Sequence, residues 1–182
     1  GWMNNPKVLF DEKVLEKGAK IVKETNKEVA AIIGINPAAR TTCVKPSGNA
    51  SVLLQTASGI HAEHSSLYIR NVQMNKESEI TQAITKTNPY MVEESVWSAN
   101  GTDVVVSFPI VPKKGSMYKD DLYGVKHLEL VAKAQKHWVI AGTNEELCAD
   151  KGIRHNVSNT IIVDDWDEVE EYVFKNRYSF SG

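Results

Sequence analysis

The hydrophobic positions at the start of the chain predict a long amphipathic helix. Over residues 7–33, Leu15, Ala19 and Val22 recur at helical spacing on one face, while lysine and glutamate fill the other. Gly34 follows this run, and glycine is typical of the position just after a helix. The sequence therefore predicts one continuous helix over residues 7–33.

A short apolar run follows and ends in a tight turn. Residues 41–44 (TTCV) are β-branched and apolar, which predicts a strand. Pro46, Ser47 and Gly48 then break the pattern, as expected of a turn. Residues 50–57 fit either a helix or an extended segment.

The rest of the chain alternates strands with helices. Runs rich in apolar and β-branched residues predict strands at residues 67–74, 103–111 and 158–163. Apolar residues at every third or fourth position predict helices at residues 77–87, 122–141 and 166–176. This mixture is typical of an α/β domain. Because no linker interrupts it, we predict a single partial domain over residues 1–182 and no second domain.

Composition and charge narrow the functional classes. The 182 residues include 21 lysines and arginines against 23 aspartates and glutamates, a net charge of −2. A module dedicated to DNA or RNA needs a basic surface, so nucleic-acid binding is not predicted. No apolar run approaches the roughly 20 residues of a membrane helix, and no signal peptide is recognisable. Since two cysteines cannot build a disulfide scaffold, we expect a cytoplasmic protein without a membrane partner.

The most informative stretch is the turn after the first predicted strand. Residues 45–51 (KPSGNAS) contain glycine, serine and lysine, so several backbone N–H groups and small hydroxyls can face one point. Such turns bind phosphate through their amides, particularly where a helix begins next. Lys45 would add a positive charge. On chemistry alone, however, a Pro-Ser-Gly segment is more often an ordinary turn.

Several separated motifs, in a fixed order, point to one protein family. They are TTCVKPSGNAS at 41–51, SGIHAEH at 58–64, LYIR at 67–70, RHNVSNTI at 154–161 and WDEV at 166–169. Together they resemble the adenosylcobalamin-dependent, or class II, ribonucleotide reductases. The resemblance covers roughly residues 38–182.

The resemblance implies a fold and a set of site residues. The fold would be the C-terminal portion of a ten-stranded α/β barrel of the ribonucleotide reductase type. The loop that holds the substrate's phosphates would consist of Ser47, Gly48, Asn49, Ala50 and Ser51. Asn49 stands where the family usually has threonine, so the hydroxyl is missing there. Asn156 and Ser158 would line the active centre or face the cobalamin.

The resemblance also implies an activity. The intact enzyme would convert ribonucleoside triphosphates, or diphosphates, to deoxyribonucleotides by a thiyl radical that adenosylcobalamin initiates. A thioredoxin-type reductant would serve it. The family's radical cysteine lies in an Asn-Pro-Cys-x-Glu loop, and neither Cys43 nor Cys148 lies in such a motif. We therefore expect no catalytic residue in this chain, which would be inactive without the remainder of the same reductase chain.

The roles of three further residues remain open, and so do two alternative functions. His61 and His64 are three positions apart, but a metal site needs more ligands, so no metal is predicted. Arg70 either helps to attract the substrate's phosphates or is a solvated charge at a strand edge. The chain could instead be a stand-alone, non-catalytic α/β module that binds a nucleotide or phosphate. It could also be a structural remnant of a barrel without a ligand.

Overall fold

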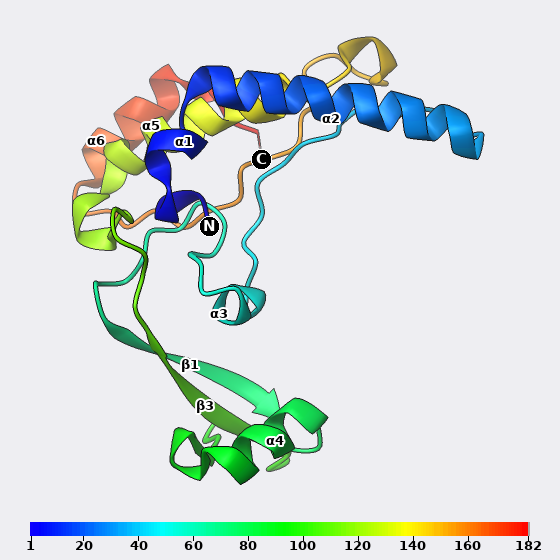
Figure 1. Ribbon diagram of the computed structural model, residues 1–182. Helices are drawn as coiled ribbons and strands as arrows, with labels where there is room; N and C mark the ends of the chain where they lie inside the picture. The colour runs from blue at the N-terminus through cyan, green and yellow to red at the C-terminus, as the bar shows by residue number, and fades with distance from the viewer. Residues whose placement is uncertain (182) are drawn as a thin grey trace.

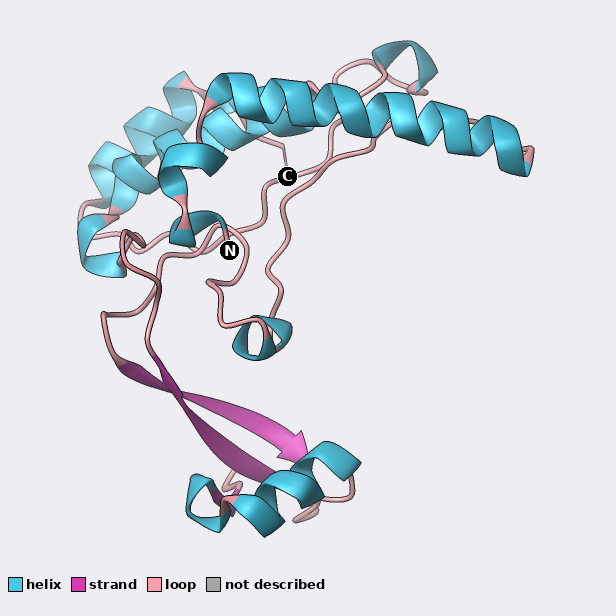
Figure 2. Ribbon diagram, in the orientation of Figure 1, coloured by secondary structure: helices cyan, strands magenta, loops and turns pink. Residues whose placement is uncertain are grey.

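The computed structural model describes residues 1–181, in which most of the helices lie at one end and a small sheet at the other. Figures 1 and 2 show α1, α2, α5 and α6 in an arch, with the sheet and α4 at the far end and α3 between them. The helices are α1 (Pro6–Leu9), α2 (Glu12–Ile33), α3 (Ala50–Leu53), α4 (Glu79–Thr87), α5 (Gly124–Ala134) and α6 (Trp166–Lys175). The strands are β1 (Tyr68–Asn75), β2 (Val92–Glu94) and β3 (Asp103–Ile110).

The long predicted helix is present, but it begins later than expected. The Asp11 side chain accepts a hydrogen bond from the Val14 backbone N–H at 3.0 Å, and this cap starts α2. The residues before it form the separate helix α1, which ends at Phe10. Gly34 ends α2 in the left-handed conformation, with φ of 74°. One helix over residues 7–33 was therefore wrong at its first turn, because Asp11 begins a new helix.

The core lies where α5 meets the extended segments and the N-terminal residues. Helix α5 continues into a π-helical turn over Gln135–Ile140, so this long helix was predicted correctly. The buried cluster unites side chains from distant parts of the sequence: Met3, Phe10, Val44, Ala57, Ile60, Leu122, Val131, Ala134, Val139 and Val157. Fully burying one large aliphatic side chain contributes roughly 1.5–3 kcal/mol, so this cluster fixes the extended segments against α5.

The sheet is antiparallel, with the order β1-β3-β2. Strands β1 and β3 pair from Tyr68 opposite Ile110 to Asn75 opposite Asp103, which confirms the two strands predicted at 67–74 and 103–111. The sequence analysis missed β2, because a strand of three residues is too short to show alternation. The sheet forms an arm that extends away from the core, as Figure 2 shows.

Two predicted strands, at 41–44 and 158–163, are extended segments instead. They meet in one isolated parallel bridge between Val44 and Val157. The Val44 N–H donates to the Asn156 carbonyl at 3.3 Å, and the Ser158 N–H donates to the Val44 carbonyl at 2.9 Å. Parallel strands are normally stabilised inside a larger sheet, and no further strand pairs with these segments in residues 1–181. The α/β class is therefore confirmed, whereas the described residues form no barrel.

Gly142 allows the extended segment to pack against the end of the long helix. A Cβ atom at Gly142 would collide with the Thr42 Oγ1 and with the Thr42 Cγ2, the latter at 2.6 Å, and Thr42 is itself held by a hydrogen bond to the Trp138 carbonyl at 2.6 Å. We expect Gly142→Ala to lower the free energy of unfolding by about 1–3 kcal/mol through overpacking. Urea denaturation measures this change.

The clash should depend on the threonine side chain. The double variant Gly142→Ala/Thr42→Ala should therefore lose less stability than the two single changes added together. Strict additivity would show that Thr42 is not the residue that Gly142 accommodates.

Candidate functional site

The loop Ser47–Ser51 leads from the first extended segment into α3. Gly48 adopts the left-handed conformation, with φ of 53°, which L-residues with a side chain rarely adopt. The turn is closed by a hydrogen bond from the Ala50 N–H to the Ser47 carbonyl and by another from the Ser51 N–H to the Gly48 carbonyl, both 3.2 Å long. The Gly48 N–H donates to the Ser58 hydroxyl, also at 3.2 Å. The conformation of the loop is thus fixed by its own bonds and by residue 58.

Two backbone amides of the loop remain available to a ligand. Within residues 1–181, no acceptor lies within hydrogen-bonding distance of the Ser47 or Asn49 N–H. Both residues are exposed, as are Gly48 and Ala50. The loop therefore presents two free donors on an open surface, which is fewer than the sequence pattern suggested.

Ser51 differs from the other loop residues because it is buried. Its hydroxyl donates to the Gly48 carbonyl at 2.6 Å and accepts a hydrogen bond from Arg70 Nη1, also at 2.6 Å. Arg70 lies on β1, so its guanidinium joins the sheet arm to the loop. The structure thus brings together two residues that the sequence analysis had singled out separately.

A buried carboxylate stands behind Arg70. Glu63 is only 2% exposed and accepts hydrogen bonds from Asn4 Nδ2 and from the Tyr68 hydroxyl, each at 2.6 Å. The Tyr68 hydroxyl in turn accepts from Arg70 Nη2 at 3.3 Å. Burial, together with the hydrogen bond to Glu63, raises the pKa of Tyr68 to about 12. A continuous chain of hydrogen bonds therefore joins Glu63 to Ser51.

The second predicted site segment lies beside the start of the loop. Asn156 and Ser158 flank the bridge residue Val157 and are both half-buried. Lys45 Nζ donates to Asn156 Oδ1 at 3.2 Å. The positive charge that might have helped the loop is therefore drawn toward residue 156. Asn156 therefore lies close to Lys45, just before the loop.

His61 and His64 do not lie on a helix, so their spacing of three positions does not bring them onto one face. His61 Nδ1 lies 2.8 Å from the Ser58 carbonyl, whereas His64 stacks at an angle on the Tyr68 ring. No group of three or more metal-ligating side chains occurs within residues 1–181. His127 on α5 is buried, with Nε2 2.9 Å from the Ile60 carbonyl, and burial lowers the pKa of His127 below its usual value.

Burial of His127 makes stability depend on pH. The unfolded chain takes up a proton on this residue near pH 6.5, while the folded chain resists it. Since the unfolded state then binds more protons, stability is lost as pH falls below about 6.5, by at most about 1.4 kcal/mol per pH unit. Urea midpoints measured between neutral and acidic pH, in a phosphate-free buffer, test this expectation.

The matched control is His64, which is exposed. His127→Asn should flatten the dependence on pH, whereas His64→Asn should leave it unchanged. Equal slopes for the parent chain and His127→Asn would rule out this origin.

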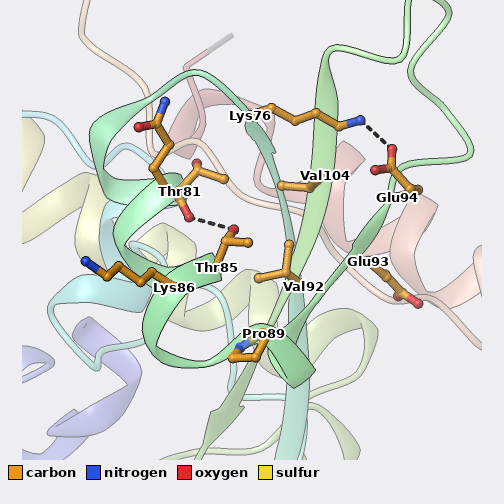
Figure 3. A pocket seen from close by; sticks show the side chains of 10 residues that line it. Lys76, Thr81, Thr85, Lys86, Pro89, Val92, Glu93, Glu94 and Val104 are labelled. Carbon is orange, nitrogen blue, oxygen red and sulfur yellow. Dashed lines mark hydrogen bonds and ion pairs between the residues drawn. The ribbon is translucent and has the colours of Figure 1, made fainter.

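A separate hollow of about 730 Å³ lies in the sheet arm, between α4 and the strands. Figure 3 shows that Lys76 is paired with Glu94 and that the Thr85 hydroxyl is bonded to the Thr81 carbonyl. These distances are 2.6 Å and 2.8 Å. Several of its polar groups already have partners, so the loop remains the better candidate for ligand binding.

Two curated proteins are similar to this chain in sequence. No protein-family model matches the chain. A curated protein of Dictyostelium discoideum, described as a probable adenosylcobalamin-dependent ribonucleoside-triphosphate reductase, is 31% identical over 121 residues, which is 66% of this chain. The adenosylcobalamin-dependent ribonucleoside-triphosphate reductase of Euglena gracilis is 27% identical over 124 residues, or 68% of the chain.

A solved structure extends the similarity to the fold. The crystal structure of a B12-dependent, class II ribonucleotide reductase covers 93% of this chain with a TM-score of 0.61 at 16% identity. The chain in turn covers 22% of that structure, and it spans only 16% and 17% of the two curated relatives.

These findings relate the chain to the ribonucleotide reductases. Within that class, both curated relatives are adenosylcobalamin-dependent enzymes named for ribonucleoside triphosphates, which confirms the family resemblance seen in the sequence motifs. In the described part of the chain, no helix is both long enough and apolar enough to cross a bilayer.

Proposed function

We propose that this chain is part of an adenosylcobalamin-dependent ribonucleoside-triphosphate reductase and holds the substrate's phosphates. The observation that carries this proposal is the exposed loop Ser47–Ser51, whose Ser47 and Asn49 amides are free and whose far end is bonded to Arg70. Backbone amides at a left-handed glycine bind oxyanions without needing a basic surface. This agrees with a chain of net charge −2.

The loop residues would have different tasks. Ser47, Gly48, Asn49 and Ala50 are exposed and would face the phosphates. Ser51 is buried and paired on both sides, so its side chain would hold the loop against Arg70. The ligand would then meet a preorganised turn, which reduces the entropy lost on binding.

The extended segments 41–44 and 157–163 would be strands of a ten-stranded barrel. Their parallel bridge at Val44 and Val157 gives the relative direction that such a barrel requires. The remaining strands would come from the rest of the reductase chain, which would also cover apolar side chains such as Ile32 and Leu53, 82% and 75% exposed. This single partial domain would therefore be inactive alone.

The intact enzyme would reduce the ribose of the bound nucleotide. Adenosylcobalamin supplies the radical that generates a thiyl on a cysteine outside this chain. That thiyl would remove a hydrogen atom from the ribose, and the 2′ hydroxyl would leave as water. A cysteine pair would supply two electrons and two protons and become a disulfide, and the first cysteine would return its hydrogen atom to the ribose and become a thiyl again. A thioredoxin-type reductant would then restore the pair. This chain would contribute the position of the nucleotide, which is a large part of catalysis.

The described residues suit a lining role toward the cobalamin. The Ser158 hydroxyl has no hydrogen-bond partner within residues 1–181, and the Asn156 carboxamide uses only its oxygen, for Lys45. Both side chains are half-buried and uncharged, so they could bond to a large polar cofactor without a charge to neutralise. They would hold or orient the group and would not ligate the cobalt.

The proposal predicts that a nucleoside triphosphate binds the loop through its backbone. Millimolar triphosphate should slow hydrogen exchange of the amides between Thr42 and Ser51, while the uncharged nucleoside should not. Asn49→Pro removes one free N–H at a residue whose φ of −65° suits proline. This change should weaken binding roughly tenfold or more, the value of a hydrogen bond to a charged group.

The matched control keeps the amide and removes only the side chain. Asn49→Ala should bind nearly as well as the parent chain. If the triphosphate protected no loop amide, the phosphate-binding role would be wrong. If Asn49→Ala lost as much affinity as Asn49→Pro, the contact would come from the side chain instead.

A further inference from the structure

A second cleft is lined by Arg70 but by no residue of the loop Ser47–Ser51, and it collects basic side chains. It has a volume of about 210 Å³ and lies between β1, α5, residues 61–64 and residues 160–162. Its polar lining consists of His61, His64, Arg70, Lys119, His127 and Thr160. Five of these six side chains are cationic or can become so, and no carboxylate lines the cleft.

The charges of this cleft have no anionic partner in the described chain. None of the ion pairs within residues 1–181 includes Arg70, Lys119 or a histidine of the cleft. The neighbouring Glu63 carboxylate is buried, and its two oxygens accept from Asn4 and Tyr68. Glu63 therefore does not neutralise the cleft directly.

Hydrogen bonds orient several of these groups and leave donors unused. The guanidinium of Arg70 has five N–H donors, and two of them are spent on Ser51 and Tyr68. Lys119 Nζ lies 3.5 Å from His64 Nε2, which leaves the other ammonium hydrogens free. Two fixed cations thus offer spare donors to the same small space.

Backbone carbonyls hold two of the histidine rings in the cleft. A carbonyl can only accept, so His61 must carry its proton on Nδ1 toward Ser58. Its Nε2 then faces the Thr160 hydroxyl at 3.3 Å. By the same reasoning, His127 donates from Nε2 to the Ile60 carbonyl, and its Nδ1 is left without a partner among the described residues.

We propose that this cleft is a second anion site, which takes a phosphate or another small oxyanion group. An oxyanion offers only acceptors, and the cleft offers the spare donors of Arg70 and Lys119. Sites for whole small molecules usually measure about 300–1,000 Å³. A cleft of 210 Å³ therefore suits a single anionic group, either free or at the end of a larger ligand.

This site does not depend on the phosphate-binding role of the loop. Arg70 touches both places, but the other residues of the cleft lie outside Ser47–Ser51. The two sites also have different reporters: the ring protons of His61, His64 and His127 for the cleft, and backbone amides for the loop. Experiment can therefore refute either site without refuting the other.

The test is a proton NMR titration of the histidine rings with inorganic phosphate, using chloride at equal ionic strength as the reference. Phosphate should shift the three cleft histidines along one saturable curve, while His137, in the π-helical turn beside Glu16, should not move. Lys119→Gln should weaken this binding roughly tenfold, because it removes a charged donor. Lys119→Arg should restore most of it, which excludes misfolding as the cause.

The control for general charge is Lys126→Gln, an exposed lysine on the same helix as His127. It should leave the phosphate curve unchanged. Unmoved histidine rings at millimolar phosphate would overturn the proposal, as would equal losses in Lys119→Gln and Lys126→Gln. Pyrophosphate and a nucleoside triphosphate distinguish the source: tighter binding of the nucleotide than of pyrophosphate means that the cleft receives the end of a nucleotide.

Discussion

Replacing Gly59 with alanine is expected to lower the free energy of unfolding by about 2–5 kcal/mol. Gly59 has a φ of 59°, and an added Cβ would lie 2.7 Å from the Lys45 carbonyl oxygen and 3.2 Å from Pro46 Cα. These are backbone atoms just before the loop Ser47–Ser51, so they cannot rotate away as a side chain could. The loop would have to move, and urea denaturation would report the loss.

The chain offers a matched control for the backbone conformation alone. Gly101 has a φ of 62°, and no atom lies within 4 Å of the Cβ that alanine would add there. Gly101→Ala should therefore cost only the left-handed conformation, roughly 1 kcal/mol. If the two variants were equally stable, the close approach of residue 59 to residues 45 and 46 would not matter. Triphosphate binding should also weaken in Gly59→Ala and stay intact in Gly101→Ala.

The second large effect is expected for Glu63→Ala. This change leaves the Asn4 amide and the Tyr68 hydroxyl without their acceptor, and each unsatisfied buried group costs about 1–3 kcal/mol. We expect a loss of about 2–5 kcal/mol in the free energy of unfolding. Since Tyr68 also holds Arg70, the amide of Ser51 should exchange faster with solvent than in the parent chain.

Two other glutamate variants separate the causes. Glu63→Gln keeps one acceptor oxygen and should lose less stability than Glu63→Ala. Glu171→Ala removes an exposed carboxylate whose partner is Lys175, and such surface pairs contribute only about 0–1 kcal/mol. A Glu63→Ala chain as stable as Glu171→Ala would mean that the buried network contributes nothing.

Local patterns were sufficient for much of the fold. The long helices and the strands β1 and β3 were predicted because each repeats its own period over eight residues or more, whereas the pairing of the two strands was not predicted. The segments 41–44 and 158–163 were predicted as strands from the same kind of evidence. They are extended but not laddered, because pairing depends on neighbours that a local pattern does not reveal.

The candidate site was predictable only in part. The loop was found because proline, serine and glycine mark a turn in the sequence itself, and the family motifs then gave it a role. Glu63 was missed as a partner of this site, since its bond to Asn4 joins residues 59 positions apart. The contact of Arg70 with Ser51 likewise arises only when β1 lies beside the loop. Position within the GIHAEH motif was the only signal for Glu63.

The lone bridge between Val44 and Val157 has a consequence for how the polypeptide acquires its shape. The neighbouring bond from His155 to the Thr42 carbonyl joins residues 113 positions apart, whereas β1 and β3 pair over much shorter separations and the helices need only nearby partners. Closing so wide a loop costs chain entropy before many contacts compensate for it. We therefore expect the helices and the sheet of β1 and β3 to form before the two extended segments join. The joining of these segments, with the loop that follows Val44, should be the slow final event.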